Sequence, residues 1–316
     1  MINRTMVRTR VVQTLFAYYQ MEDSTLSSAR KSLQKSYEDL YALYIHLFGF
    51  ANELVRYAEQ QMEESRARAK ATHTTYMPDR RFLDNRFVHD LFVHHELRHW
   101  TEEYRLSWDA GMNAVINIYR MLQTQPFFHE YMKLPETTYE DDRRLFRRIY
   151  QVLLPNNESV HHALEEMEIA LDRNHWSTDF EVILSYVIKT MKQFKQEGDE
   201  PKLLPMFESE EELQFGLDLM QKTIENREAY SKLIDKYLRN WEADRVAYMD
   251  RIIMLTALTE ILCFPNIALE ISLNEYIEIA KEYSSEKSHI FINGILDNIL
   301  KEQNITGVIP AESNQL

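Results

Sequence analysis

The stretch RVAYMDRIIMLTALTEILCFPNIALEISLNEYIEIAKEYSSEKSHIFINGILD, residues 245–297, decides the fold class. Apolar residues recur there three or four positions apart, first at Val246, Met249, Ile253, Ala257 and Ile261. The same spacing returns at Leu273, Ile277 and Ala280, and then at Phe291, Ile292, Ile295, Leu296 and Ile299. Residues at this spacing share one face of an α-helix. The stretch predicts three consecutive amphipathic helices, the second opening at Asn274, and indicates a helical bundle.

The composition also favours an all-α protein. The chain has 316 residues, of which 45% are hydrophobic and 12% aromatic, enough to bury a core and to form two domains. It has only 6 glycines and 8 prolines, fewer than proteins rich in sheet or loops contain. This composition excludes a disordered chain.

The sequence predicts a cytoplasmic protein. Its most apolar segment, residues 246–264, contains Asp250, Arg251 and Glu260, which argues against a membrane span. The N-terminus lacks the uninterrupted apolar region and small-residue cleavage site of a secretory signal. Cys263 is the single cysteine and cannot form an internal disulfide.

The charge is negative overall but uneven along the chain. A net charge of -14 argues against a protein that coats nucleic acid indiscriminately. Residues 4–20, by contrast, predict a basic amphipathic helix that contains Arg4, Arg8 and Arg10. Arg4 and Arg8 lie one turn apart, which suits a local RNA contact, although the same arginines also fit a terminal helix that is merely solvated.

Separated positions along both ends of the chain resemble the NusB family of bacterial transcription antitermination factors. In the C-terminal part these are Asp250, Arg251, Asn274, Glu275, Ser288, Phe291, Asn293 and Gly294, preceded by Phe215, Leu219, Ile224, Ile234, Tyr237, Leu238, Trp241 and Arg245. At the N-terminus they are Arg8, Val12, Gln13, Leu15 and Phe16, which resemble the family's arginine motif. The resemblance implies an all-α fold, a NusB-like antiparallel helical bundle.

The N-terminal motif departs from the family pattern in ways that bear on RNA binding. The family's basic run is denser, and Thr5 and Met6 stand where further arginines are expected. Phe16 replaces the usual tyrosine, so that stacking survives while a phenolic hydrogen bond is lost. Lys287 stands where some members carry an acid that contacts RNA, which exchanges an acceptor for a cation. These departures imply weaker or altered RNA recognition.

The resemblance is interrupted by a large insertion. We expect residues 1–22 to be the basic helix of the bundle and 23–205 a helical insertion of unknown role. Residues 206–303 form the expected C-terminal bundle, and 304–316 a flexible tail. Within the insertion, helical spacing runs through 24–71, a polar loop is expected over 72–86, and Lys195–Pro205 is the best linker candidate.

A histidine-rich segment in the insertion offers an alternative chemistry. His95, Glu96 and His99 form H-E-x-x-H, which on a helix places two imidazoles one turn apart for zinc, with a carboxylate as general base. Neighbouring histidines raise the chance of an accidental match. We therefore keep a zinc hydrolase as a remote alternative and otherwise expect no enzyme, metal or cofactor, because the chain has no Walker loop, G-x-G-x-x-G, C-x-x-C or G-x-S-x-G.

The RNA-facing set combines cations for phosphates with aromatic rings for bases. It comprises Arg4, Arg8, Arg10, Gln13, Phe16, Lys287, Ser288, Phe291 and Asn293, with Phe16 and Phe291 brought together if the first helix packs beside the last. The resemblance implies pairing with the ribosomal protein NusE on boxA-type RNA, and action on elongating RNA polymerase with other Nus factors during ribosomal RNA transcription. Two alternatives remain: a NusB-fold protein-interaction scaffold without RNA binding, and the RNA-binding domain of an rRNA methyltransferase, whose cofactor-binding domain does not follow here.

Overall fold

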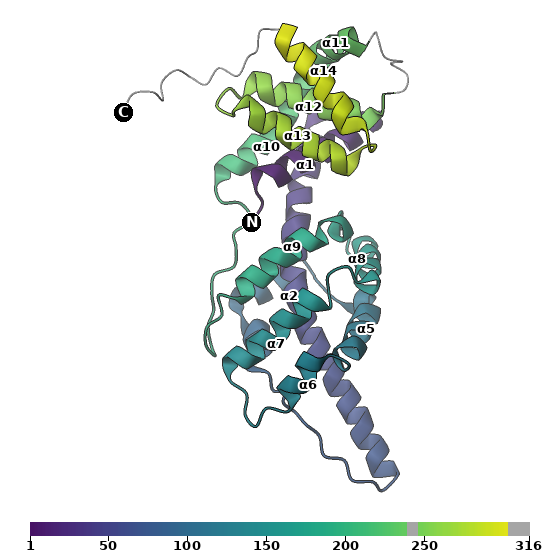
Figure 1. Cartoon of the computed structure of the whole chain (residues 1–316), viewed down its shortest axis with the longest axis vertical. Coiled ribbons are helices and arrows are strands. Elements are labelled where there is room, and N and C mark those ends of the chain that lie inside the picture. The colour runs from purple at the N-terminus through teal and green to yellow at the C-terminus, as the bar shows by residue number, and fades with distance from the viewer. Residues whose placement is uncertain (239–245, 303–316) are drawn as a thin grey trace, which may run out of the picture. The chain divides into compact units, whose positions relative to one another are not determined.

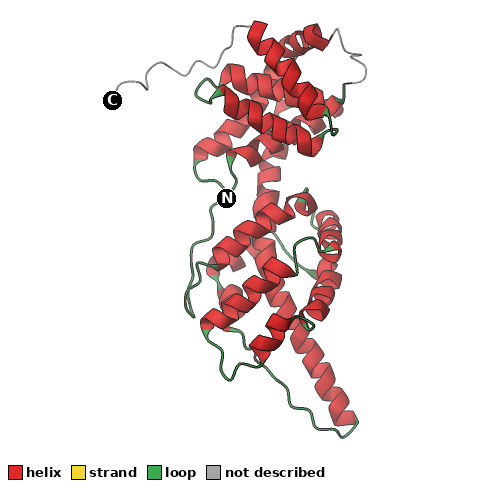
Figure 2. Ribbon diagram, in the orientation of Figure 1, coloured by secondary structure: helices red, strands yellow, loops and turns green. Residues whose placement is uncertain are grey.

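The computed structural model describes residues 1–238 and 246–302, and the regular elements in these ranges are helices (Figures 1 and 2). They comprise fourteen α-helices and a short 3₁₀ turn, so the predicted all-α, NusB-like class with additional helices is confirmed. Extended pairing within the described residues is limited to a single parallel bridge between Ile2 and Phe207. No helix in these ranges combines the length and apolarity that crossing a membrane requires.

The chain divides into two compact units. Unit 1 comprises Met1 and Glu38–Met206, and unit 2 comprises Ile2–Tyr37 and Phe207–Leu316. The insertion was expected to begin at residue 23, whereas residues 23–37 group with the N-terminal helix in unit 2. The expected tail, 304–316, lies outside the described residues, as do Trp241 and Arg245 of the family pattern.

Unit 2 is built around α12 (Tyr248–Cys263). The helices that pack against it are α1 (Arg4–Gln20), α10 (Glu210–Glu225), α11 (Arg227–Leu238), α13 (Leu269–Tyr283) and α14 (Ser288–Glu302). Every residue from 252 to 260 is buried. A helix enclosed on all sides needs no polar face. The periodicity predicted one buried face for α12, whereas the structure buries its central part on all faces.

The second helix of the C-terminal region begins earlier than predicted. We expected it to open at Asn274, but α13 starts at Leu269 and Asn274 lies inside it. The preference of asparagine for helix starts is a weak signal that tertiary packing overrides. Here the first turns of α13 bring Ser272 into the core, where its hydroxyl donates to a Glu260 carboxylate oxygen at 2.6 Å.

Unit 1 is a second compact unit made of helices, and it contains the polar loop that the sequence predicts. It contains most of α2 (Leu26–Ala71) together with α3 (Arg86–Val93), α4 (His95–Glu103), η1 (Asp109–Gly111), α5 (Met112–Leu122), α6 (Pro126–Met132), α7 (Tyr139–Val152), α8 (Glu158–Ala170) and α9 (Trp176–Met191). The polar loop expected after residue 71 is present and ends where α3 begins. Pro126 is the first residue of α6, a position that needs no backbone N–H.

The expected linker at 195–205 is held down along its length. The backbone N–H of Gly198 donates to an Asp90 carboxylate oxygen at 2.9 Å, and the N–H of Leu203 donates to Glu96 at 3.3 Å. Both acids lie on α3 and α4, so this segment is fixed to the surface of unit 1.

Candidate nucleic-acid interface

One face of α14 carries an open groove with a volume of about 370 Å³. Its lining comes from residues three or four positions apart and their neighbours: Lys287, Ile290, Phe291, Gly294, Ile295 and Asn298. Ile290 is 67% exposed and adds apolar surface to the groove. The groove therefore combines an exposed cation in the turn before α14 with a half-buried aromatic ring and apolar surface on α14.

Several features of this groove suit a flat, anionic ligand. The exposed Lys287 presents an ammonium for phosphate, and Phe291 presents a ring for a base. A Cβ atom added at Gly294 would meet nothing within 4 Å, so the backbone there is open to close approach. Asn293 is exposed on the same helix and offers both a donor and an acceptor.

Ser288, expected to contact a base edge, is instead part of the core. Its side chain is buried, and its hydroxyl donates to Asp250 Oδ2 at 2.9 Å. Ser284 donates to the other oxygen of Asp250, so one buried carboxylate ties the start of α14 to the end of α13. Ser288 therefore positions α14, and its hydroxyl is occupied within the protein.

Arg8, expected at the RNA-facing surface, is also buried, with only 2% of its side chain exposed. Its guanidinium donates to both carboxylate oxygens of Glu260, at 2.8 and 2.9 Å, and lies 3.5 Å from Glu275. The Tyr276 hydroxyl donates to Glu260 at 2.9 Å. This network joins α1, α12 and α13, which gives Arg8 a role inside the fold.

Electrostatics keep this network charged. Burial alone would lower the pKa of the Arg8 guanidinium, but the hydrogen bonds and negative charge of Glu260 raise it. Burial, together with the adjacent Glu260, raises the pKa of Tyr276 well above its ordinary value. Arg8 is therefore a permanent cation and Tyr276 a neutral donor, a pairing that satisfies the buried carboxylate.

The other two N-terminal arginines differ from each other. Arg10 is buried and donates to the Gln13 side-chain oxygen at 2.7 Å. Arg4 has 44% of its side chain exposed, although its Nε donates to Glu212 at 3.1 Å. Its guanidinium also lies 5.2 Å from the centroid of the Phe215 ring. Of these three arginines, Arg4 is the one at the surface.

The aromatic residue of the N-terminal motif has a partner that the sequence did not reveal. Phe16 is half-buried, and its ring centroid lies 5.6 Å from that of Tyr248. We expected α1 to pack beside α14, which would bring Phe16 close to Phe291. The principal partners of α1 are α10, α12 and α13, while α14 packs against α11, α12 and α13 (Figure 1). The structure therefore brings Lys287 and Phe291 together and groups Phe16 with Tyr248.

Two sequence signals could have identified residues that we missed. Glu260 is an acid within a highly apolar segment, and a buried acid requires a cation or strong donors nearby. This signal predicts a partner such as Arg8. Ile290 and Asn298 follow the helical spacing of Lys287 and Phe291, which would have placed them on the same face.

The Glu96 carboxylate of the H-E-x-x-H segment has a structural role. His95 and His99 lie exposed on α4, but Glu96 accepts the hydrogen bond from the backbone of Leu203. Within the described ranges, no three His, Cys, Asp or Glu side chains come together in a way that could hold a metal ion. The geometry gives the zinc-hydrolase alternative no support.

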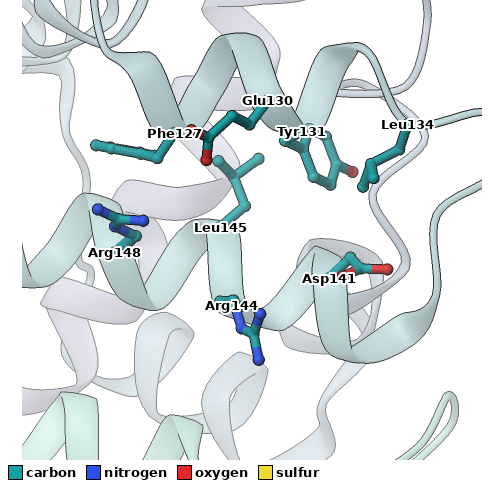
Figure 3. A pocket seen from close by; sticks show the side chains of 8 residues that line it. All are labelled: Phe127, Glu130, Tyr131, Leu134, Asp141, Arg144, Leu145 and Arg148. Atoms are coloured by element: carbon teal, nitrogen blue, oxygen red, sulfur yellow. The ribbon is translucent and has the colours of Figure 1, made fainter.

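Unit 1 has a cavity of about 200 Å³ between α6 and α7 (Figure 3). Two of its polar groups serve the fold: the Tyr131 hydroxyl donates to Asp142 at 2.8 Å, and Asp141 caps the start of α7. The Arg148 guanidinium lies 4.9 Å from the Phe127 ring centroid. These side chains already have partners within the protein, so they do not require a ligand to satisfy them.

The sequence of this chain matches known proteins, mainly over unit 2. The model of the NusB family matches residues 180–301. A transcription antitermination protein NusB of Methylacidiphilum infernorum is 42% identical over 83 residues, which are 26% of this chain and 58% of that protein. One of Salinibacter ruber is 36% identical over 121 residues, or 36% of this chain and 76% of that protein. No solved structure matches the chain.

These matches define an all-α protein with a NusB-type bundle, and the chain belongs to the NusB family. The coverage varies among relatives. The chain spans less than two thirds of several of them, including 59% of the Thermodesulfovibrio yellowstonii protein.

Proposed function

We propose that this protein is a non-enzymatic transcription antitermination factor that binds boxA-type RNA together with the ribosomal protein NusE. The curated relatives carry the name transcription antitermination protein NusB. The observation that carries the RNA-binding part is the α14 groove, in which Lys287 and Phe291 share one open face. RNA polymerase with other Nus factors is the proposed site of action.

Recognition through this groove relies on stacking more than on charge. Base stacking on an aromatic side chain contributes about 1–3 kcal/mol per base. Arg4 and Lys287 are the exposed cations in the proposed set, since Arg8 and Arg10 are buried. Two phosphate contacts to a single strand give an expected salt slope of about -1.4 in log K against log salt.

The test measures binding of a labelled boxA-type RNA, with and without purified NusE, at two salt concentrations. Saturable binding that NusE strengthens, with a shallow salt slope, supports the proposal. Lys287→Ala should weaken binding, whereas Lys301→Ala near the end of α14 should not, because Lys301 lies outside the groove and pairs with Asp297 at 2.5 Å. Absence of binding under every condition would refute RNA recognition.

A protein-interaction scaffold without RNA binding is the second candidate, and the burial of Arg8 and Arg10 favours it. If those arginines were the family's main RNA contacts, this chain would retain the bundle and lose the contact. Absence of RNA affinity under every condition would favour the scaffold, whereas wild-type RNA affinity in Lys287→Ala and Phe291→Ala would place RNA binding outside the α14 groove.

A further inference from the structure

Unit 1 contains a second cavity, which differs in character from the one between α6 and α7. Its volume is about 530 Å³, and it lies among α2, α3, α4 and the segment leading into η1. Aromatic side chains line it, among them Phe48, Phe92 and Trp108. Cavities of 300–1,000 Å³ with apolar walls and a few polar groups are typical of small-molecule sites.

The floor of this cavity is rigid and neutral. The Trp108 ring stacks on His46 with centroids 4.4 Å apart and an interplanar angle of 11°. Trp108 Nε1 donates to the backbone oxygen of His46 at 3.1 Å. Burial lowers the pKa of His46 to about 3, so the imidazole is uncharged near neutral pH. A pre-formed apolar floor of this kind suits a flat ring.

One polar group in the cavity is unsatisfied. The side-chain oxygen of Asn52 is buried and has no hydrogen-bond partner among the described residues. Asn52 as a whole is only partly buried, so its amide nitrogen is accessible to a ligand in the cavity. Buried polar groups are almost always paired, so an unpaired carboxamide in a cavity points to a ligand that supplies both a donor and an acceptor.

The rim adds an exposed ring and opposite charges. Phe92 is 64% exposed although it lines the cavity. Arg98 and Glu102 lie one turn apart on α4, both exposed, and form no ion pair within the described residues. Glu53 is neutralised by an ion pair with Arg56. The rim therefore offers one cation and one uncompensated carboxylate.

We propose that this cavity binds an adenosine moiety. Asparagine pairs with adenine through two hydrogen bonds, accepting from the amino group and donating to a ring nitrogen. That pattern satisfies both amide atoms of Asn52, and the aromatic walls receive the flat base. At the rim, Glu102 accepts from a ribose hydroxyl and Arg98 meets a phosphate.

Other ligand classes fit less well. An aliphatic lipid would leave the Asn52 carboxamide unpaired. A peptide backbone could pair with the Asn52 carboxamide but presents no flat ring to the aromatic walls. The adenosine can come from a free nucleotide or from single-stranded RNA, and both share this chemistry. The proposal does not depend on antitermination or on the α14 groove.

The test uses calorimetry on the full-length protein with adenosine, inosine, AMP and an adenylate 12-mer. Inosine replaces the amino group with oxygen, so its affinity should be at least about tenfold lower than that of adenosine. Equal affinity of AMP and the 12-mer per site indicates a free nucleotide as the source, and much tighter 12-mer binding indicates RNA. Absence of saturable binding by all four probes overturns the proposal.

Two variants link binding to the cavity. Asn52→Leu should lower adenosine affinity at least about tenfold while keeping or raising the melting temperature, because it removes a buried carboxamide oxygen that has no hydrogen-bond partner. Gly49→Leu should abolish binding by filling the cavity, whereas the control Gly49→Ala should bind normally, since its Cβ lies an ordinary 3.5 Å from Trp108 Nε1. Wild-type affinity in both Asn52→Leu and Gly49→Leu would overturn the assignment.

Discussion

The first helix of unit 2, α1, and its last, α14, were both expected to contact RNA. The cations expected to make this contact lie in different environments at the two helices. In α1 the Arg8 guanidinium is buried against Glu260, and Arg10 is buried beside Gln13. Directly before α14, the exposed Lys287 lines an open groove. This difference shows that a motif cation should be interpreted as a ligand contact only after the structure has been searched for an acidic partner within the protein.

The largest expected effect concerns the buried network of α1. Glu260→Gln removes the carboxylate that accepts two hydrogen bonds from the buried Arg8 guanidinium and leaves only the longer 3.5 Å contact with Glu275. Breaking a buried ion pair costs about 3–5 kcal/mol. The free energy of opening of α1 and α12 in amide hydrogen exchange measures this cost within unit 2.

The control is an exposed ion pair on α1, the helix that contains Arg8. Arg4→Ala removes an exposed ion pair with Glu212 and should change the same free energy by at most about 1 kcal/mol. Equal effects of Glu260→Gln and Arg4→Ala would show that Arg8 is not held by its buried partner, and the contrast between α1 and α14 would fail.

A second effect tests how tightly the α1 side is packed. A Cβ atom built at Gly216 would lie 2.3 Å from the Tyr37 hydroxyl and 2.8 Å from Val7 Cγ1. Gly216→Ala should therefore destabilise unit 2 by about 1–3 kcal/mol through overpacking.

The Tyr37 hydroxyl provides the internal control for this prediction. It is buried and forms no hydrogen bond with a described residue, so Tyr37→Phe alone should be nearly neutral. Combined with Gly216→Ala, it should recover part of the lost stability in denaturant unfolding. If the double variant were no more stable than Gly216→Ala, the Tyr37 hydroxyl would not be the group that the added methyl clashes with.

The smallest expected stability effect has the opposite sign and lies on α14. Nothing surrounds an added Cβ at Gly294, so Gly294→Ala should stabilise the helix by about 0.5–1 kcal/mol. Thermal melting of unit 2 checks this. A destabilised Gly294→Ala variant would mean that the α14 groove is closed in solution.

The sequence predicted the helical class because apolar spacing depends on local geometry. Residues 4–20 coincide with α1, and the loop after residue 71 is present. The start of α13 was missed because burial of Ser272 beside Glu260, a contact across helices, overrides the capping preference of Asn274.

The candidate sites were harder to predict than the fold. Helical spacing placed Arg8 near the surface, since the sequence cannot show that α12 brings Glu260 to it. The α14 groove was partly foreseen through Phe291 on α14 and Lys287 directly before it, which are four positions apart in the sequence. The cavity around Asn52 was not foreseen, because its walls come from separate helices of unit 1.

The most direct test of the central claim, that α14 and not the arginine helix carries RNA recognition, compares Phe291→Ala with Arg4→Ala in boxA-type RNA binding. Loss of stacking in Phe291→Ala should weaken binding by about 1–3 kcal/mol. Arg4→Ala should do less, mainly lowering the magnitude of the salt slope by about 0.7. Wild-type affinity in Phe291→Ala together with a large loss in Arg4→Ala would contradict the account.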